Sequence, residues 1–168
     1  MKRCSLAFST LLLFLLLFLP ISGALAWRDA SEKDELTGKK IPLQAERAKT
    51  PIRQFGRDVP VDLYLKCISA SRDGSDAFPV AFLWFSESIG IGEIFGRVLI
   101  DDRQPPISHT YPINDRGRSI ILASLTDSLR RSSKLKAQFD FPWAGRPVLE
   151  FNTTGAAKAF AALPCANP

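Results

Sequence analysis

Apolar and polar residues alternate along several short segments of this chain, and this alternation is its clearest structural signal. Because successive side chains of a strand point to opposite faces of a sheet, such a pattern predicts β-strands with one buried face. The alternation is strongest in residues 61–68, 134–141 and 148–152. Residues 78–85 are apolar on both faces, which predicts a strand in the middle of a sheet or beneath another layer.

Weaker patterns predict further strands and a first short helix. A helix is expected over residues 124–131, with Thr126 as its cap. Residues 48–60 contain Pro51, Gly56 and Pro60 and are expected to form a long connection. The remaining strands are expected near residue 27 and at residues 41–46, 94–101, 109–113 and 119–123.

The chain closes with a strand that leads into a second short helix. Thr153 or Thr154 is expected to cap this helix, and Pro164 disfavours helical geometry at the preceding residue, so the helix ends there. Its apolar residues recur at helical spacing, at Ala156, Ala159, Phe160 and Leu163. The elements together predict a mainly β fold, an antiparallel β-sandwich or distorted barrel with two short helices, one of them C-terminal.

Residues 1–26 have the composition of a secretory signal peptide. Two cations precede an apolar run at residues 6–19, and an Ala-Leu-Ala sequence ends at Ala26. Cleavage after Ala26 is therefore expected, which would leave residues 27–168 as a single β-rich domain that is periplasmic or secreted. The alternative is an uncleaved anchor, but the apolar run is short for a spanning helix, so no stable membrane span is expected after cleavage.

Two cysteines remain after this cleavage, Cys67 on the apolar face of residues 61–68 and Cys165 after the closing helix. In an oxidising compartment they predict one intramolecular disulfide, and the alternative is a pair of free buried thiols. Closing a loop on the order of 100 residues contributes about 4–5 kcal/mol in chain-entropy models. We expect no metal site and no cofactor, because two cysteines and the single histidine, His109, fall short of four zinc ligands.

The chain is mildly basic, with 22 Lys and Arg against 17 Asp and Glu and a formal net charge of +5. This balance does not by itself indicate nucleic-acid binding, and export would remove the usual target, so no nucleic-acid partner is expected. Six cations nevertheless cluster with Asp127 alone among them. If the first helix and the following strand lie side by side, the six would form a patch for an anionic envelope component, and the alternative is solvated charge. The six are Arg116, Arg118, Arg130, Arg131, Lys134 and Lys136.

Three aspartates, Asp101, Asp102 and Asp140, could supply a carboxylate pair of the kind that hydrolases use. Adjacent strand residues face opposite ways, however, so Asp101 and Asp102 need not converge. His109 lies in a proline-flanked segment and is expected to be an exposed residue without a catalytic role. We therefore expect no enzyme, and a small envelope hydrolase that uses these carboxylates is the alternative.

Four segments of the chain resemble small exported bacterial proteins. They resemble the VasI-like proteins linked to type VI secretion clusters and, more distantly, the invasion-associated locus B proteins. The segments are LYLKC, GRVLIDDRQPP, KLKAQFDF and LEFNTTGAAKAFAALPC. The resemblance implies a non-enzymatic binding or accessory module of the bacterial cell envelope, whose partner is an envelope protein or an anionic envelope component. It supplies no catalytic residues.

Overall fold

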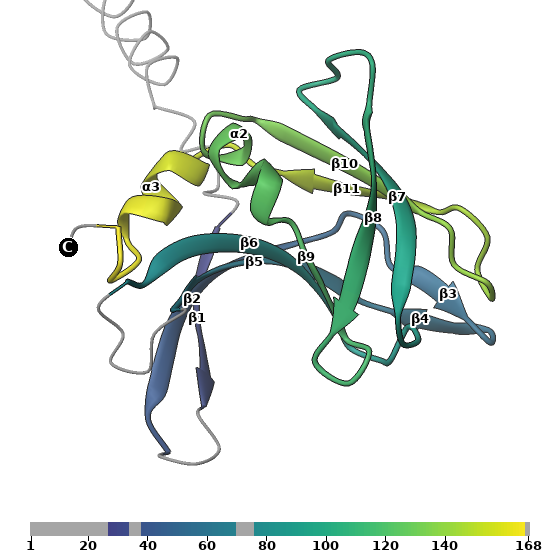
Figure 1. The fold of residues 1–168 in the computed structure, drawn as a ribbon, viewed down its shortest axis with the longest axis horizontal. Helices are drawn as coiled ribbons and strands as arrows, with labels where there is room; N and C mark the ends of the chain where they lie inside the picture. The colour runs from purple at the N-terminus through teal and green to yellow at the C-terminus, as the bar shows by residue number, and fades with distance from the viewer. Residues whose placement is uncertain (1–26, 34–37, 70–75, 167–168) are drawn as a thin grey trace, which may run out of the picture.

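The strands pair into one antiparallel sheet of nine strands and a second sheet of two (Figure 1). The structure is a computed structural model, in which residues 27–33, 38–69 and 76–166 are described, so the predicted signal peptide lies outside the described residues. The strands are β1 (Arg28–Lys33), β2 (Lys40–Arg47), β3 (Ile52–Gln54), β4 (Arg57–Val59), β5 (Val61–Ile68), β6 (Phe78–Phe85), β7 (Glu93–Ile100), β8 (Ile107–Asn114), β9 (Ser119–Ile121), β10 (Lys134–Phe139) and β11 (Val148–Asn152). The order in the large sheet is β1-β2-β5-β6-β9-β8-β7-β10-β11, and β3 pairs with β4.

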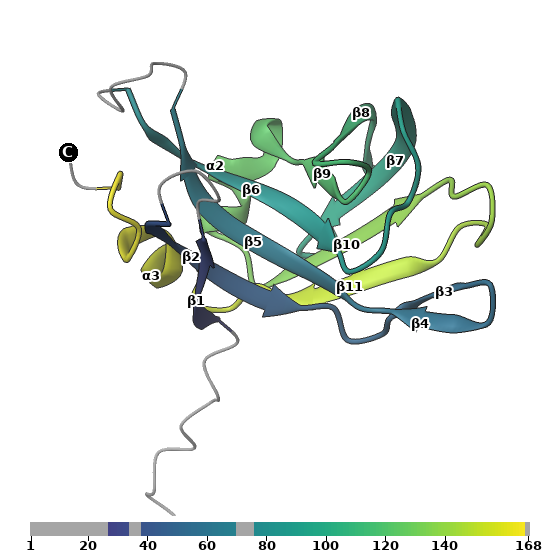
Figure 2. The same ribbon diagram turned by 90° about the horizontal axis from the view of Figure 1, so that it is seen from below.

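The large sheet folds over at β8 and β9 into two layers (Figures 1 and 2). β8 pairs with β7 over most of its length but meets β9 only through Ile113 and Asn114. One layer therefore contains β1, β2, β5, β6 and β9, and the other contains β7, β8, β10 and β11. Just beyond β2, the backbone N–H of Lys49 donates to the carbonyl of Glu150 at 2.8 Å, but the sheet is not closed into a barrel.

The hydrophobic core lies between the two layers. Leu63 of β5 and Leu83 of β6 are fully buried, and so is Phe151 of β11 in the opposite layer. The rings of Phe85 and Phe141 meet with their centroids 5.9 Å apart. The residues that the alternation places on apolar faces are thus the residues that fill the core.

Two short helices cover one end of the layers (Figure 1). A 3-10 turn at Ala123–Leu125 leads into α2 (Thr126–Arg130), and α3 (Ala156–Ala161) follows the last strand. Neither helix is long or apolar enough to cross a bilayer, and the same holds throughout the part of the chain that the structure describes. The predicted fold class is confirmed: the protein is mainly β and antiparallel, with two short helices, one of them C-terminal.

The predicted threonine caps are wrong. α3 begins after Gly155, whose φ of 83° lies in the left-handed region that glycine adopts without strain, and no side chain caps the helix. Thr153 is instead fully buried, and its hydroxyl shares a hydrogen bond of 2.6 Å with the hydroxyl of Ser132. The hydroxyl of Thr126 accepts a hydrogen bond of 3.3 Å from the N–H of Ala81 and so ties α2 to β6.

The disulfide between Cys67 and Cys165 is present, as predicted. It joins β5 to the segment after α3, across a sequence separation of 98 residues and with Cα atoms 5.9 Å apart. α3 packs Ala159 and Phe160 into the core beside it. The bond therefore holds the last helix against a central strand.

Residues 48–60, predicted as a long connection, contain the hairpin of β3 and β4. Ile52 pairs with Val59 across this hairpin, and each side chain is 1% exposed. Phe55 at the turn is 83% exposed. Strands of three residues with one buried side chain each are too short to produce a visible alternation, which explains why the sequence did not predict them.

Candidate ligand-binding cleft

Asp101 and Asp102 form the turn that follows β7, and both have left-handed backbone geometry, with φ of 50° and 55°. The Asp101 carboxylate accepts hydrogen bonds from the backbone N–H groups of Ser133 and Lys134 at 2.7 and 3.0 Å, and from the Ser133 hydroxyl at 2.9 Å. These bonds favour the charged form and hold the pKa of Asp101 below its usual value. Asp101 thus fixes the end of β7 to the start of β10.

Asp102 is engaged by two lysines of β10. Its carboxylate accepts hydrogen bonds from the ammonium group of Lys136 at 2.6 Å and from that of Lys134 at 2.9 Å. These contacts, that of Lys136 first, lower the pKa of Asp102 to about 2. The carboxylate therefore stays ionised at neutral pH and is poorly suited to act as a general acid.

Asp140 lies at the other end of the same strands. Its backbone N–H donates to the carbonyl of Phe95 near the start of β7, and its carboxylate pairs with Arg146 at 2.7 Å. The structure therefore places Asp140 away from Asp101 and Asp102 and does not assemble the three carboxylates into one site.

The six cations of the predicted patch lie in separate places. Arg116 and Arg118 are in the turn between β8 and β9, beside the start of β7, whereas Lys134 and Lys136 are at the opposite end of β7, and Arg130 and Arg131 are in and just after α2. Lys134 and Lys136 share Asp102. The guanidinium of Arg130 stacks over the ring of Phe160 at 5.1 Å. Arg131, at the end of α2, lines a cleft.

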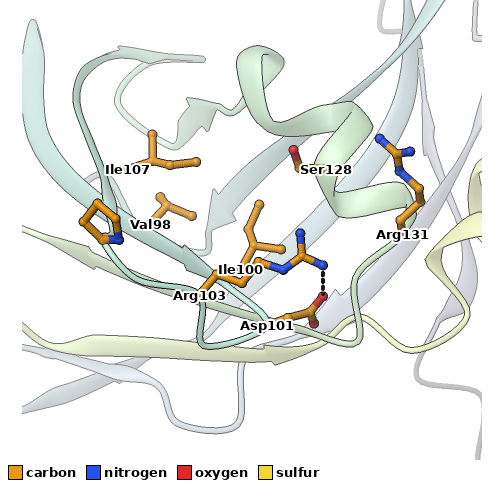
Figure 3. A pocket seen from close by; sticks show the side chains of 8 residues that line it. Val98, Ile100, Asp101, Arg103, Ile107, Ser128 and Arg131 are labelled. Carbon is orange, nitrogen blue, oxygen red and sulfur yellow. Dashed lines mark ion pairs between the residues drawn. The ribbon is translucent and has the colours of Figure 1, made fainter.

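This cleft has a volume of about 430 Å³ and lies between α2 and the inner face of β7 and β8 (Figure 3). Val98, Ile100 and Ile107 form its strand side, and Ser128 and Arg131 form its helix side. Ile107 points to the same face of β8 as the buried Tyr111, yet it is 45% exposed. β9 meets β8 only at Ile113 and Asn114, so the end of β8 that carries Ile107 has no described strand beside it on that edge.

Charged groups form the rim of the cleft. Arg103 approaches Asp101 with a nitrogen-to-oxygen distance of 4.0 Å and is 79% exposed (Figure 3). Arg131 is exposed and has no ion pair with any residue in the described ranges. Since Asp101 already accepts three hydrogen bonds from residues 133–134, the two guanidinium groups keep most of their capacity to bind an anion.

The sequence predicted Arg131 as an anion ligand but missed Arg103, Ser128 and the apolar side of the cleft. Val98 and Ile107 occupy inward positions of their strands, and an inward apolar residue is normally a core residue. A proline-flanked strand start such as that of Ile107 was the only available signal that a strand might begin before its neighbours cover it. That signal is too general to identify a cleft.

A carboxyl group with a raised pKa lies where β2 and β11 approach each other without pairing. Glu46, near the end of β2, is half-buried and points toward β11, where the backbone N–H of Asn152 bonds to it. Burial raises the pKa of Glu46 to about 7, against the lowering effects of that hydrogen bond and of Arg28. No sequence pattern indicated this residue.

His109 does not take part in a catalytic arrangement with a cysteine. It is exposed on β8, with its ring edge-on to Tyr111 at 5.2 Å, and both cysteines of the described chain are in the disulfide. No group of three His, Cys, Asp or Glu residues that could hold a metal ion occurs within the described ranges.

Comparison with family models and with curated proteins gave no match. Among solved structures, the fold is similar to the crystal structure of invasion associated protein B from Bartonella henselae, with a TM-score of 0.48 and 16% sequence identity. The similarity covers 80% of this chain and 88% of that chain. It concerns the fold alone.

Proposed function

We propose that this chain is an exported, non-enzymatic binding or accessory module of the bacterial cell envelope, and that the cleft between α2 and β7–β8 binds its ligand. The observation that carries the proposal is the composition of the cleft: an apolar side that includes the exposed Ile107, and a rim with two guanidinium groups. Binding sites for small molecules are concave and mostly apolar, with a few polar groups that set orientation. The ligand class that fits is an amphiphile with one anionic group.

The two halves of such a ligand have different partners. Its apolar part would cover Ile107 and the small exposed part of Ile100, since Val98 is already fully buried, and each buried methylene stabilises binding by about 0.8 kcal/mol. Its anionic group would lie between Arg103 and Arg131, because a planar guanidinium donates two hydrogen bonds to one carboxylate or phosphate. Both arginines are exposed, so salt should weaken this part of the interaction.

The cellular part of the proposal rests on the sequence. The composition of residues 1–26 supports export, and the disulfide fits an oxidising compartment. The four segments that resemble VasI-like proteins support membership of that group and an accessory role in the envelope. The hydrolase alternative gains no support, since Asp101 and Asp102 are held by structural contacts and Asp140 lies elsewhere.

Binding of dodecanoate to the purified exported protein tests the proposal. Isothermal titration should detect dodecanoate but not octaethylene glycol monododecyl ether, which has an alkyl chain of the same length and neither charge nor sugar, and not acetate, which lacks the chain. Arg131→Gln should weaken dodecanoate binding by about tenfold or more, since hydrogen bonds to charged groups contribute about 1.5–3 kcal/mol.

Arg130→Gln is the matched control. It removes the same charge from the adjacent residue, whose guanidinium stacks on Phe160 and does not line the cleft. It should leave dodecanoate affinity nearly unchanged. Equal effects of the two substitutions would mean that only net charge matters, and equal affinities for dodecanoate and octaethylene glycol monododecyl ether would exclude an anion site.

A further inference from the structure

We propose a second binding site, an aromatic platform for a sugar ring of a neutral glycan, on the outer face of β5 and β6. The platform consists of Tyr64, Phe82 and Trp84. It shares no residue with the cleft and lies in the opposite layer of the sheet. β1, β2, β5 and β6 lie next to one another across this layer (Figure 2).

The strand register brings the three rings together. Tyr64 pairs directly with Phe82, and Trp84 pairs with Asp62, so Tyr64 and Trp84 are diagonal neighbours on one face. Their rings are nearly parallel, with an interplanar angle of 13° and centroids 6.3 Å apart. Because Leu63 and Leu83 point into the core, this face is turned away from the other layer.

The platform is accessible and is bounded on one side by β1 and β2. Tyr64 and Trp84 are partly exposed, whereas Phe82 is 4% exposed and meets the Tyr64 ring edge-on at 5.5 Å. A pocket of about 170 Å³ lies over the three rings, bounded by β1 and β2 through Ala30, Ser31, Glu32 and Leu43. The buried Phe82 therefore supports two rings whose outer surfaces remain open.

Ion pairs flank the rings on two sides. On one side Lys66 pairs with Glu32 at 2.9 Å, and its ammonium group lies 5.0 Å from the centroid of Phe82. On the other side the Asp62 carboxylate lies between Arg28 and Arg47, at 3.0 and 2.8 Å. Hydrogen-bond donors and acceptors are thus held at the edge of an apolar aromatic surface.

This arrangement matches the chemistry of a sugar ring. One face of a pyranose carries C–H groups that pack on an aromatic ring, while its hydroxyl groups project sideways and need hydrogen-bond partners when water is displaced. The Tyr64 hydroxyl can serve as one such donor, because a tyrosine is protonated at neutral pH and burial raises the pKa of Tyr64 further.

The charged groups around the platform favour a neutral sugar over an organic cation. Aromatic clusters also bind quaternary ammonium groups through cation–π contacts. Here Arg28, Arg47 and Lys66 outnumber the carboxylates of Asp62 and Glu32, and Lys66 already occupies the ring of Phe82. A further cation would meet repulsion, so a neutral ligand fits better.

Titration of the isotope-labelled protein with cellotriose and with triacetylchitotriose, followed by NMR, tests the inference. At least one of these neutral sugars should shift the indole signal of Trp84 and the backbone signals of Tyr64 and Lys66. Trp84→Ala should weaken sugar binding at least about tenfold, as loss of a central aromatic contact does. Phe78→Ala, which removes an exposed ring from the end of the same strand, should not.

Because the NMR chemical-shift changes are measured on the wild-type protein, the test remains decisive even if the Trp84→Ala variant does not fold. Absence of binding of both sugars at millimolar concentration would overturn the inference. So would shifts confined to Val98 and Ile107 in the cleft, or saturable binding of tetramethylammonium in place of the sugars. If Trp84→Ala folds, it should still bind dodecanoate like the wild type, which separates this site from the cleft.

Discussion

Glu46→Gln should remove a pH dependence from the stability of this protein. Because burial raises the folded-state pKa of Glu46 from 4.5 to about 7, the folded protein binds more protons than the unfolded chain between these values. This group therefore favours the folded state most below pH 4.5, and that contribution is lost as the pH rises through 7. The full shift corresponds to about 3 kcal/mol at 1.36 kcal/mol per pKa unit, and solvent screening of a partly exposed group reduces it to about 1–2 kcal/mol.

The substitution preserves the contact while removing the charge. The side-chain carbonyl of glutamine can still accept the hydrogen bond from the N–H of Asn152. Urea denaturation should therefore give equal unfolding free energies for wild type and Glu46→Gln at pH 4, and a value about 1–2 kcal/mol higher for the variant at pH 8.

Glu150→Gln is the matched control for this experiment. Glu150 has its pKa lowered by Lys49, so neutralising it should reduce stability at pH 8 and not increase it. A Glu46→Gln variant that gains nothing between pH 4 and pH 8 would show that the Glu46 carboxyl is solvated and that the layers are more open at this point than the structure indicates.

Three further predictions concern the fold and its processing. Cys165→Ser should lower the unfolding free energy by about 2–5 kcal/mol and loosen α3 first, measured by denaturation and hydrogen exchange, and non-reducing peptide mapping should recover Cys67 and Cys165 as one linked peptide. Gly96→Ala should lower the denaturation midpoint by the equivalent of about 1–3 kcal/mol, because the added methyl would lie 2.5 Å from two ring carbons of Phe139. Intact-mass analysis of exported protein should give a chain that starts at Trp27, and a retained leader would contradict the predicted cleavage after Ala26.

Alternation predicted the strands well where one face is buried against the other layer. Residues 61–68 and 148–152 coincide with β5 and β11 as observed, and Cys67 was placed correctly on the inner face. A buried face fixes both the register and the identity of every second residue, so the sequence carries the signal. β3 and β4 carry no comparable signal, because three residues with one buried side chain do not define a period.

The sites could not be predicted in the same way, because they depend on pairings between distant segments. The alternation of residues 61–68 places Tyr64 on the polar face of its strand. Its aromatic neighbours Phe82 and Trp84 belong to a strand whose sequence predicts burial on both faces. The six cations of the predicted patch are separated in the structure for a related reason. Arg118 and Arg130 are close in sequence, but β9 and the turn before α2 carry the chain from one end of the layers to the other.

The incomplete pairing of the large sheet is the physical origin of both unusual features of its interior. At β2 and β11 the strands approach without closing a barrel, so the half-buried carboxyl of Glu46 takes the place of strand pairing at Asn152. At β8 the contact with β9 ends within two residue pairs, so the end of β8 that carries the exposed Ile107 has an open edge beside the cleft. A closed barrel would bury Ile107 and leave no opening beside Arg131. The ligand binding that we propose for the cleft therefore depends on the sheet remaining open, and substitutions that extend the pairing of β9 with β8 toward Ile107 should reduce dodecanoate affinity while raising stability.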